Sequence, residues 1–175
     1  MKAHKINLFL SFCFISDVNE HTPQFTNGGS YTTLVPENAT VGTLVSNVTA
    51  TDLDIGSVYG LVNYAITSGN VNDAFTIRTT DGLVFVKRPL DREKTGSYSL
   101  VIEAADQDPI SPLSSTATLV VTVTDINDNA PSCLPCIYGA SINESVAIGT
   151  TVAQLTCSDA DLSPNIISSY TITTG

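Results

Sequence analysis

Short apolar stretches with alternating polar positions run through most of the chain, and turn-forming residues separate them. Leu44, Val48 and Ala50, for example, alternate with polar positions such as Ser46. The pattern predicts β-strands at Gly42–Ala50, Leu61–Thr67, Ala74–Arg78, Leu83–Lys87, Ser97–Ala104 and Ser115–Thr124. No stretch shows a sustained helical period. About seven short strands in about 105 residues predict an all-β, immunoglobulin-like sandwich.

Turn signals and composition favour the same fold class. The pair Asp81-Gly82 stands between two strand-like runs, Phe75–Ile77 and Leu83–Val86. Glycine adopts the positive φ of a tight turn at little cost, so this pair predicts a β-hairpin. Threonine, valine and isoleucine together make up 53 of the 175 residues, which is a bias typical of sheets.

The chain resembles itself at a separation of 107 to 108 residues. The clearest match aligns residues 41–54, VGTLVSNVTATDLD, with residues 148–161, IGTTVAQLTCSDAD. Further matches keep the same order: DVNEHTP (17–23) with DINDNAP (125–131), Glu37 with Glu144, and NYAIT (63–67) with SYTIT (169–173). A period of this length is typical of tandem domains. We therefore expect a linker at 17–21, a complete repeat at 22–128 and a truncated second repeat at 129–175.

Residues 1–16 allow two interpretations. Two lysines precede an apolar run from Ile6 to Ile15, which has the length of the hydrophobic part of a signal peptide. The same run would also suit the last, buried strand of a preceding repeat. Ten apolar residues are too few to span a bilayer, so neither interpretation predicts a transmembrane helix here.

Net charge limits the class of partner. Lysine and arginine total 7 against 17 aspartates and glutamates, which gives a formal charge of -10. This balance argues against nucleic acid or an acidic membrane surface as the main partner and favours a cation. Histidine occurs only at His4 and His21, which argues against a Ser/His/Asp triad. We expect a chain that is not an enzyme.

The four cysteines indicate an extracellular compartment. Only Cys133 and Cys136 are closely spaced, and no histidine lies near them, so the pattern fits no zinc site. The pair also lacks the βαβ context of a thioredoxin-like motif. We expect a disulfide that joins Cys157 to either Cys133 or Cys136. Sequons at Asn38, Asn47 and Asn143 suit a secreted glycoprotein.

Acidic residues gather at loop boundaries as alternate or near-neighbour pairs: Asp52/Asp54, Asp91/Glu93, Asp106/Asp108, Asp125/Asp128 and Asp159/Asp161. Alternate residues of an extended segment point to one side, so each pair can offer two carboxylates to one point. Several carboxylates in one place repel one another and call for a counter-cation. Oxygen-only ligands favour a hard cation, and Ca²⁺ accepts six to eight of them.

The same residues resemble the motifs of cadherin ectodomains, in order and over nearly the whole chain. DVNEHTPQF (17–25) and DINDNAPSC (125–133) are similar to the cadherin linker, and VPEN (35–38) is similar to the early glutamate motif. ATDLD (50–54) and CSDAD (157–161) are similar to the paired-aspartate motif, LDRE (90–93) to the acidic turn, and AAD (104–106) to the late aspartate. The resemblance implies tandem, seven-stranded Greek-key sandwich repeats of the cadherin type.

The resemblance also implies a ligand set for calcium. A linker of this kind commonly holds three Ca²⁺ ions between two repeats. Its ligands here would be Glu37, Asp91 and Glu93 from the first repeat, Asp125, Asp128, Asn127 and the carbonyls of Ile126 and Asn129 from the linker, and Asp159, Asp161 and the carbonyl of Asn165 from the second repeat. An upstream half-site would use Asn19, the His21 carbonyl, Asp52, Asp54 and Asp106, with Glu20 in place of the usual aspartate.

The function that the resemblance implies is calcium-dependent adhesion or recognition at the cell surface, in which Ca²⁺ stiffens a rod of repeats. The partner would be another cadherin-like ectodomain, homophilic or heterophilic, and the parent protein would be membrane-anchored. The chain has no tryptophan, so it resembles internal protocadherin-like or Fat-like repeats rather than the adhesive tip of classical cadherins. One alternative is a calcium-stabilised extracellular module that binds carbohydrate or spaces the domains of a secreted protein. Glycoside hydrolysis by paired carboxylates is a weaker alternative, because the pairs recur at domain spacing.

Overall fold

The structure is a computed structural model and describes residues 18–56 and 58–173. The N-terminal run that the sequence leaves open between signal peptide and strand, with Asp17, lies outside these residues. Regular structure in the described part consists of strands and two 3-10 turns, η1 (Thr26–Gly29) and η2 (Val71–Asp73). The strands up to residue 124 are β1 (Gln24–Phe25), β2 (Ser30–Pro36), β3 (Leu44–Asn47), β4 (Ala50–Thr51), β5 (Asn63–Ser68), β6 (Phe75–Ile77), β7 (Leu83–Val86), β8 (Ser97–Ala105) and β9 (Ser114–Thr124).

Two main sheets form the sandwich. The larger sheet has the order β2-β9-β8-β5 and the smaller one β3-β7-β6, while β1 and β4 form a separate pair. Strand β2 runs parallel to β9, and the other neighbours are antiparallel. Gly82 precedes β7 with φ 69°, so the predicted hairpin between β6 and β7 is present. The prediction of an all-β sandwich is confirmed.

Two features of the sandwich differ from the strands expected from the sequence. Strand β2 lies outside the predicted segments, because Tyr31 and Val35 are its only buried residues and three residues separate them, so no clear alternation marks the strand. The predicted strand 42–50 is split: β3 pairs with β7, whereas Ala50 of β4 pairs with Phe25 of β1. The pairing of β3 with β7 is itself irregular between Leu44 and Ser46.

The core lies between the two sheets. Alternate residues of β8 and β9 point into it, and Leu100 and Leu119, which face each other in the sheet register, are fully buried. Two core tyrosines keep their hydroxyls paired, as buried polar groups require. The Tyr31 hydroxyl donates to the carbonyl of Thr26 at 2.9 Å, and the Tyr64 hydroxyl contacts the backbone of Ala50.

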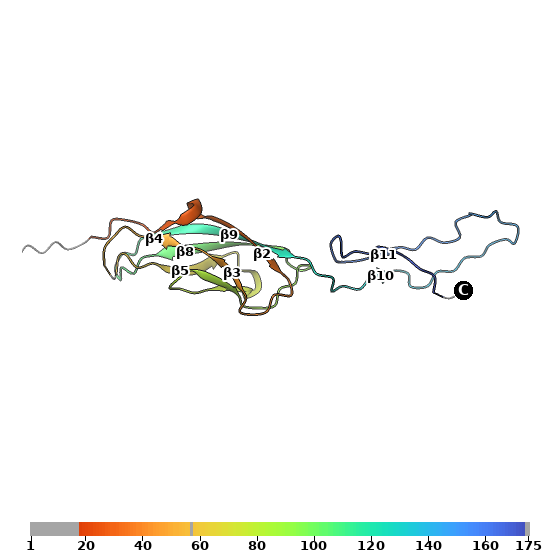
Figure 1. The fold of residues 1–175 in the computed structure, drawn as a ribbon, viewed down its shortest axis with the longest axis horizontal. Coiled ribbons are helices and arrows are strands. Elements are labelled where there is room, and N and C mark those ends of the chain that lie inside the picture. Colours follow the sequence, from red (N-terminus) through yellow and green to blue (C-terminus); the bar gives the residue numbers. More distant parts are fainter. Residues whose placement is uncertain (1–17, 57, 174–175) are drawn as a thin grey trace, which may run out of the picture.

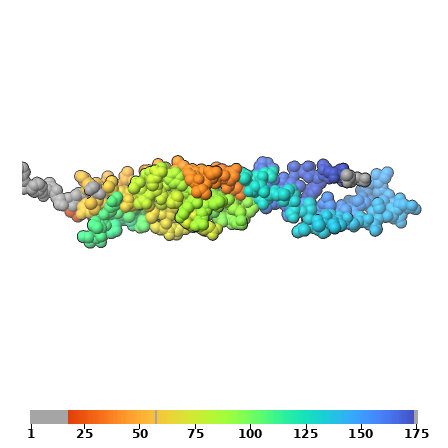
Figure 2. Space-filling view, turned by 90° about the horizontal axis from the view of Figure 1, so that it is seen from below, coloured from red at the N-terminus to blue at the C-terminus, as the bar shows by residue number. Residues whose placement is uncertain are grey.

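The chain continues beyond β9 into a C-terminal segment, residues 129–173, with the short antiparallel strands β10 (Ser132–Cys133) and β11 (Cys157–Ser158). A disulfide joins Cys133 to Cys157, and Cys136 is free and exposed, which settles the two pairings left open by the sequence. The sandwich and this segment follow one another along the long axis of the molecule (Figure 1). The chain after β11 lies against residues 125–129 at the joint between the two parts (Figure 2). Within the described part of the chain, no helix reaches the length and hydrophobicity that a membrane crossing needs.

Candidate metal centre

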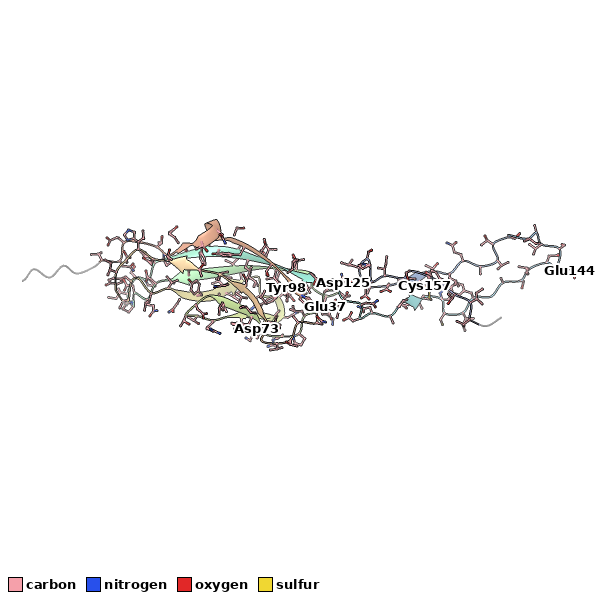
Figure 3. All side chains as sticks on the ribbon, in the orientation of Figure 1. Glu37, Asp73, Tyr98, Asp125, Glu144 and Cys157 are labelled. Carbon is pink, nitrogen blue, oxygen red and sulfur yellow. A yellow bond between two sulfur atoms is a disulfide. The ribbon has the colours of Figure 1, made fainter. Side chains whose placement is uncertain are left out.

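Glu37 follows β2 at the end of the sandwich that faces the C-terminal segment (Figure 3). It is 5% exposed, and both of its carboxylate oxygens accept hydrogen bonds from the backbone. The amide of Arg92 donates to Oε2 and the amide of Ile126 donates to Oε1, each at 2.8 Å. One buried carboxylate therefore holds together the loop after β7 and the chain that leaves β9.

Asp125 follows β9 directly and connects the sandwich to the C-terminal segment. Its Oδ1 contacts Nε of Arg92, while its Oδ2 accepts hydrogen bonds from the amide of Leu162 and the side chain of Asn165, each at 2.9 Å. Burial acts to raise the pKa of Asp125, but the hydrogen bonds from Asn165, Leu162 and Arg92 hold the pKa below its ordinary value. Asp125 is therefore held as a carboxylate between the two parts.

Asp128, Asn129 and Asp161 form the other side of the joint. The side-chain amide of Asn129 donates to Asp128 at 2.7 Å and to Asp161 at 2.8 Å, and Asp161 is 3% exposed. The pKa of Asp128 is raised, first by burial and then by the negative charges of Glu37, Asp161, Asp91 and Asp125. A raised carboxyl pKa with these causes indicates that carboxylates crowd together here.

The crowded carboxylates form two overlapping clusters, in each of which one oxygen per residue lies within 4.8 Å of the others. The first is Glu37, Glu93 and Asp128, and the second is Glu93, Asp125 and Asp161. Calcium binds oxygens at 2.3–2.6 Å, so oxygens on opposite sides of one ion are separated by up to about twice that distance. The donor set and its spacing therefore fit a hard cation. A hollow beside it is lined by Leu90, Asp91, Glu93, Lys94, Asp128 and Asn129.

Other predicted ligands of this joint have different partners in the structure. Both oxygens of Asp91 contact Lys94, at 2.9 Å to the amide and 2.6 Å to Nζ, and the pKa of Asp91 is lowered chiefly by that side chain. Asp159 accepts a hydrogen bond from the amide of Asp161 at 3.1 Å. The Ile126 carbonyl accepts a hydrogen bond from the Asp128 amide at 3.0 Å.

Two asparagines complete the predicted set. Asn127 is exposed in the chain between Asp125 and Asp128. Asn165 reaches the joint through its side-chain amide, as described above, and its backbone amide donates to the carbonyl of Leu162 at 2.7 Å. The structure thus places Asn165 at the joint, but by a group other than the carbonyl that the sequence singled out.

The sequence pattern does not single out Arg92, which also lies at this joint. It is the third residue of LDRE and stands between two predicted ligands. Its guanidinium contacts Asp125 and Glu93, and Nη2 donates to the carbonyl of Ala160 at 2.7 Å. A basic residue between two acidic ones was the only available signal, and a surface salt bridge gives the same signal.

The upstream residues gather at the opposite end of the sandwich. Asp54 is 8% exposed and accepts hydrogen bonds from the backbone amide and from Nδ1 of His21, at 3.1 and 2.5 Å. Glu20, His21 and Asp54 each have a ligand atom within 4.8 Å of the others. The prediction named the carbonyl of His21, whereas the structure brings its imidazole to Asp54.

Asn19, Asp52 and Asp106 lie at the same end. Asn19 donates through Nδ2 to Asp106 at 2.9 Å, and Asp106 is 4% exposed. Among the described residues, two buried side-chain atoms have no hydrogen-bond partner, namely Oδ1 of Asn19 and Oδ2 of Asp52. Both atoms are oxygens that can only act as acceptors. Buried acceptors without a donor are rare unless a cation or water satisfies them. These two oxygens therefore also fit a hard cation.

Comparison with known sequences finds a family profile and several relatives that match most of the chain or its sandwich. A family profile described as "Cadherin domain" matches residues 31–124. Human Cadherin-23 is 41% identical over 165 residues, which covers 92% of this chain and 5% of that protein. Cadherin-8 of Rattus norvegicus is 39% identical over 166 residues, covering 92% and 20%, and protein dachsous of Drosophila melanogaster is 38% identical over 151 residues, covering 86% and 4%. The chain thus spans a fifth or less of the length of these relatives.

Solved structures agree with the sequence comparison. Repeats EC22-24 of mouse Cadherin-23 have a TM-score of 0.79 and 31% identity, covering 86% of this chain and 47% of that one. The extracellular domain of protocadherin GammaB4 has a TM-score of 0.77 and 30% identity, covering 86% and 25%.

Proposed function

The chain belongs to the cadherin family, and from this premise we propose that it is part of an adhesion or recognition ectodomain whose rod is stiffened by calcium between repeats. From membership of the family we also infer an extracellular, adhesion-type role rather than an enzymatic one. The calcium dependence and the stiffening are the parts that we infer here.

One observation carries the proposal: a single cluster draws carboxylates from all three parts of the joint. Glu93 comes from the sandwich, Asp125 from the linker and Asp161 from the C-terminal segment, with ligand oxygens within 4.8 Å of one another. Two unpaired carboxylates about 4 Å apart repel by roughly 4 kcal/mol at an effective dielectric constant of about 20. Such repulsion opposes the close approach of the two parts unless positive charge offsets it.

A bound Ca²⁺ supplies positive charge and shared oxygen coordination at the joint. The residues that would hold the calcium ions of this joint are Glu37, Asp91, Glu93, Asp125, Ile126, Asn127, Asp128, Asn129, Asp159, Asp161 and Asn165. Because these residues belong to both parts, ions that the two parts share favour one orientation of the joint over the others. The upstream set, Asn19, His21, Asp52, Asp54 and Asp106, would form half of the equivalent joint to a preceding repeat.

The division into repeats is part of the proposal. We assign residues 22–128 to one repeat and 129–175 to the start of the next. In support, Glu37 lies at the joint, whereas Glu144, its counterpart in the sequence repeat, lies at the far tip of the C-terminal segment (Figure 3). This is where a second joint of the same kind would use it.

The proposed partner is inferred from membership of the cadherin family. We propose that the parent protein is membrane-anchored at the cell surface and that its partner is another cadherin-like ectodomain. The relatives support this only as proteins of the same family, because the chain spans a small share of their length.

Small-angle X-ray scattering of the whole chain tests the stiffening. With millimolar calcium we expect a narrow distribution of interatomic distances whose largest distance is that of an extended rod. With a chelator we expect a broader distribution. The double substitution Glu93→Gln and Asp161→Asn is expected to abolish the difference. Asp73→Asn, on the side of the sandwich, serves as control and is expected to preserve it (Figure 3). Identical profiles of the unsubstituted chain with calcium and with chelator would contradict the proposal.

A further inference from the structure

Arg92 is unlike the other basic residues that the structure describes. Its side chain is 12% exposed, whereas the side chains of Arg78, Lys87, Arg88 and Lys94 are 47 to 80% exposed. Those four pair with single aspartates at the surface. Arg92 is instead enclosed at the joint between the sandwich and the C-terminal segment.

The guanidinium of Arg92 contacts every part of the joint. Within its own loop it contacts Glu93, in the linker it contacts Asp125 through Nε, and in the C-terminal segment it donates to the Ala160 carbonyl at 2.7 Å. Arginine suits such a position because its planar group offers five donors in fixed directions. The side chain therefore acts as a clamp across the same gap that the carboxylates surround.

The carboxylates that Arg92 contacts are also members of a candidate cation cluster. Glu93 and Asp125 form that cluster together with Asp161. Arg92 contacts Oδ1 of Asp125, whereas the amide of Leu162 and the side chain of Asn165 donate to Oδ2. A guanidinium and a calcium ion would thus compete for the same oxygens of Glu93 and Asp125. The guanidinium and a calcium ion on the same carboxylates would also repel each other.

We infer that Arg92 is a built-in counter-cation of the joint: it clamps the two parts together at low calcium and must leave Glu93 and Asp125 for calcium to bind. The inference rests on the proposed function for the identity of the competing ion. Arg92 would lower the calcium affinity of the joint and would set the calcium concentration at which the ion replaces the side chain. It would also limit bending of the joint when calcium is scarce.

Calorimetric titration of the whole chain with calcium chloride tests the competition. Arg92→Gln removes the charge and keeps much of the length, and we expect it to bind calcium about tenfold more tightly, equal to ~1.4 kcal/mol. Arg92→Lys keeps the charge on a flexible stem, and we expect an affinity close to that of the unsubstituted chain. Arg88→Gln is the matched control, because it removes the same charge from a surface pair with Asp73, and its affinity should change less than about twofold.

Scattering in chelator gives a second readout, which a change in affinity alone would not move. We expect Arg92→Gln to broaden the distance distribution relative to the unsubstituted chain, and Arg88→Gln to leave it unchanged. Thermal unfolding of each variant checks that the sandwich is intact. If Arg92→Gln fails to fold, Arg92→Met, which retains apolar contacts of the stem, replaces it in both measurements.

The outcomes separate this inference from the proposed function. If the unsubstituted chain binds no calcium, the proposed function fails, and a broader distribution for Arg92→Gln in chelator would still support the clamp. If the unsubstituted chain binds calcium but Arg92→Gln binds equally or less tightly, the competition is overturned while the proposed function stands.

Discussion

The carboxylate of Glu37 accepts the amide hydrogen of Ile126 at 2.8 Å, across 89 residues of sequence. Glu37 is buried at the end of β2, and Ile126 is the second residue after β9. The contact fixes where the chain leaves the sandwich, and so it fixes the position of Asp125 and Asp128 on either side of Ile126. Glu37 therefore has a structural role at the joint in addition to its proposed role as a ligand.

This contact predicts that Glu37→Gln destabilises the sandwich even in chelator. Glutamine keeps the size of the side chain, but its amide group would point a donor at a backbone donor, either Arg92 or Ile126. Leaving a buried donor unpaired costs about 1–3 kcal/mol. Chemical unfolding in chelator measures the loss. Glu144→Gln, at an exposed position, is the control and should be neutral. Equal unfolding midpoints for the two variants would refute the structural role.

Calcium affinity should depend on Asp128 and not on Asp73. Asp128 belongs to a carboxylate cluster with Glu37 and Glu93, whereas Asp73 pairs with Lys87 and Arg88 on the surface. We expect Asp128→Ala to weaken calcium binding by tenfold or more, about 1.4 kcal/mol, because one charged ligand is lost. Asp73→Ala should bind as the unsubstituted chain does. Calorimetry compares the two, and similar affinities for both variants would count against the ligand assignment.

The contact between His21 and Asp54 predicts a pH dependence. The hydrogen bond to Asp54 raises the pKa of His21 above its ordinary value of 6.5. A group with a raised pKa binds its proton more tightly in the folded state. Its contribution to stability is therefore complete below pH 6.5 and is lost as the pH rises through the raised pKa of His21. Stability measured from pH 6 to 9 should show this loss.

Nuclear magnetic resonance follows the His21 ring directly in the same experiment. The midpoint of the His21 titration should lie above pH 6.5 in the unsubstituted chain and should fall in Asp54→Asn. Asp81→Asn removes a carboxylate that pairs with Arg78 and serves as control. A midpoint that stays the same in Asp54→Asn would show that the contact does not set the pKa of His21.

The disulfide predicts a difference between two neighbouring cysteines. It closes a loop with a sequence separation of 24 residues, in a segment whose strands β10 and β11 have only two residues each. Closing a loop of this length stabilises by about 3 kcal/mol, so Cys157→Ser should make residues 134–156 much more sensitive to thermolysin. Cys136→Ser should digest at the rate of the unsubstituted chain. Equal cleavage rates in the two variants would argue against the Cys133–Cys157 pairing.

The core predicts the largest loss of stability. Leu119 is fully buried on β9 opposite Leu100 of β8, and Val120, the next residue, is 36% exposed. Leu119→Ala removes buried apolar atoms and leaves a cavity, which costs about 2–5 kcal/mol. Val120→Ala should cost much less. Denaturant unfolding measures both, and a loss below 1 kcal/mol for Leu119→Ala would contradict the register of β8 and β9 as described.

Those parts of the fold that depend on local sequence pattern could be predicted from the sequence. The alternation of apolar residues in 115–124 predicted β9, since a strand buries every second side chain of one face. Alternation does not predict strand β2, because only two of its residues are buried. The strand is held by parallel pairing with β9, which lies more than 80 residues away in the sequence. Pairing over such a distance leaves no local signal.

Local sequence pattern also predicts the carboxylate pairs at the joint, but it does not predict which basic side chains contact them. The sequence indicated that Glu93 and Asp125 belong to one joint, because the motif spacing recurs. Nothing in the sequence distinguishes Arg92, which contacts both of them, from Lys94, which lies two residues further on and pairs with Asp91 at the surface. Side-chain direction in a loop depends on contacts that the chain makes elsewhere.

The sequence alone therefore determined the all-β class, the tandem period and the family of motifs, because these follow from the spacing of residue types along the chain. The tertiary structure decided which cysteine pairs with Cys157, how Glu37 fixes the exit of the linker, and that a guanidinium lies among the carboxylates of the joint. Those features depend on distances between residues far apart in sequence, and only folding sets such distances.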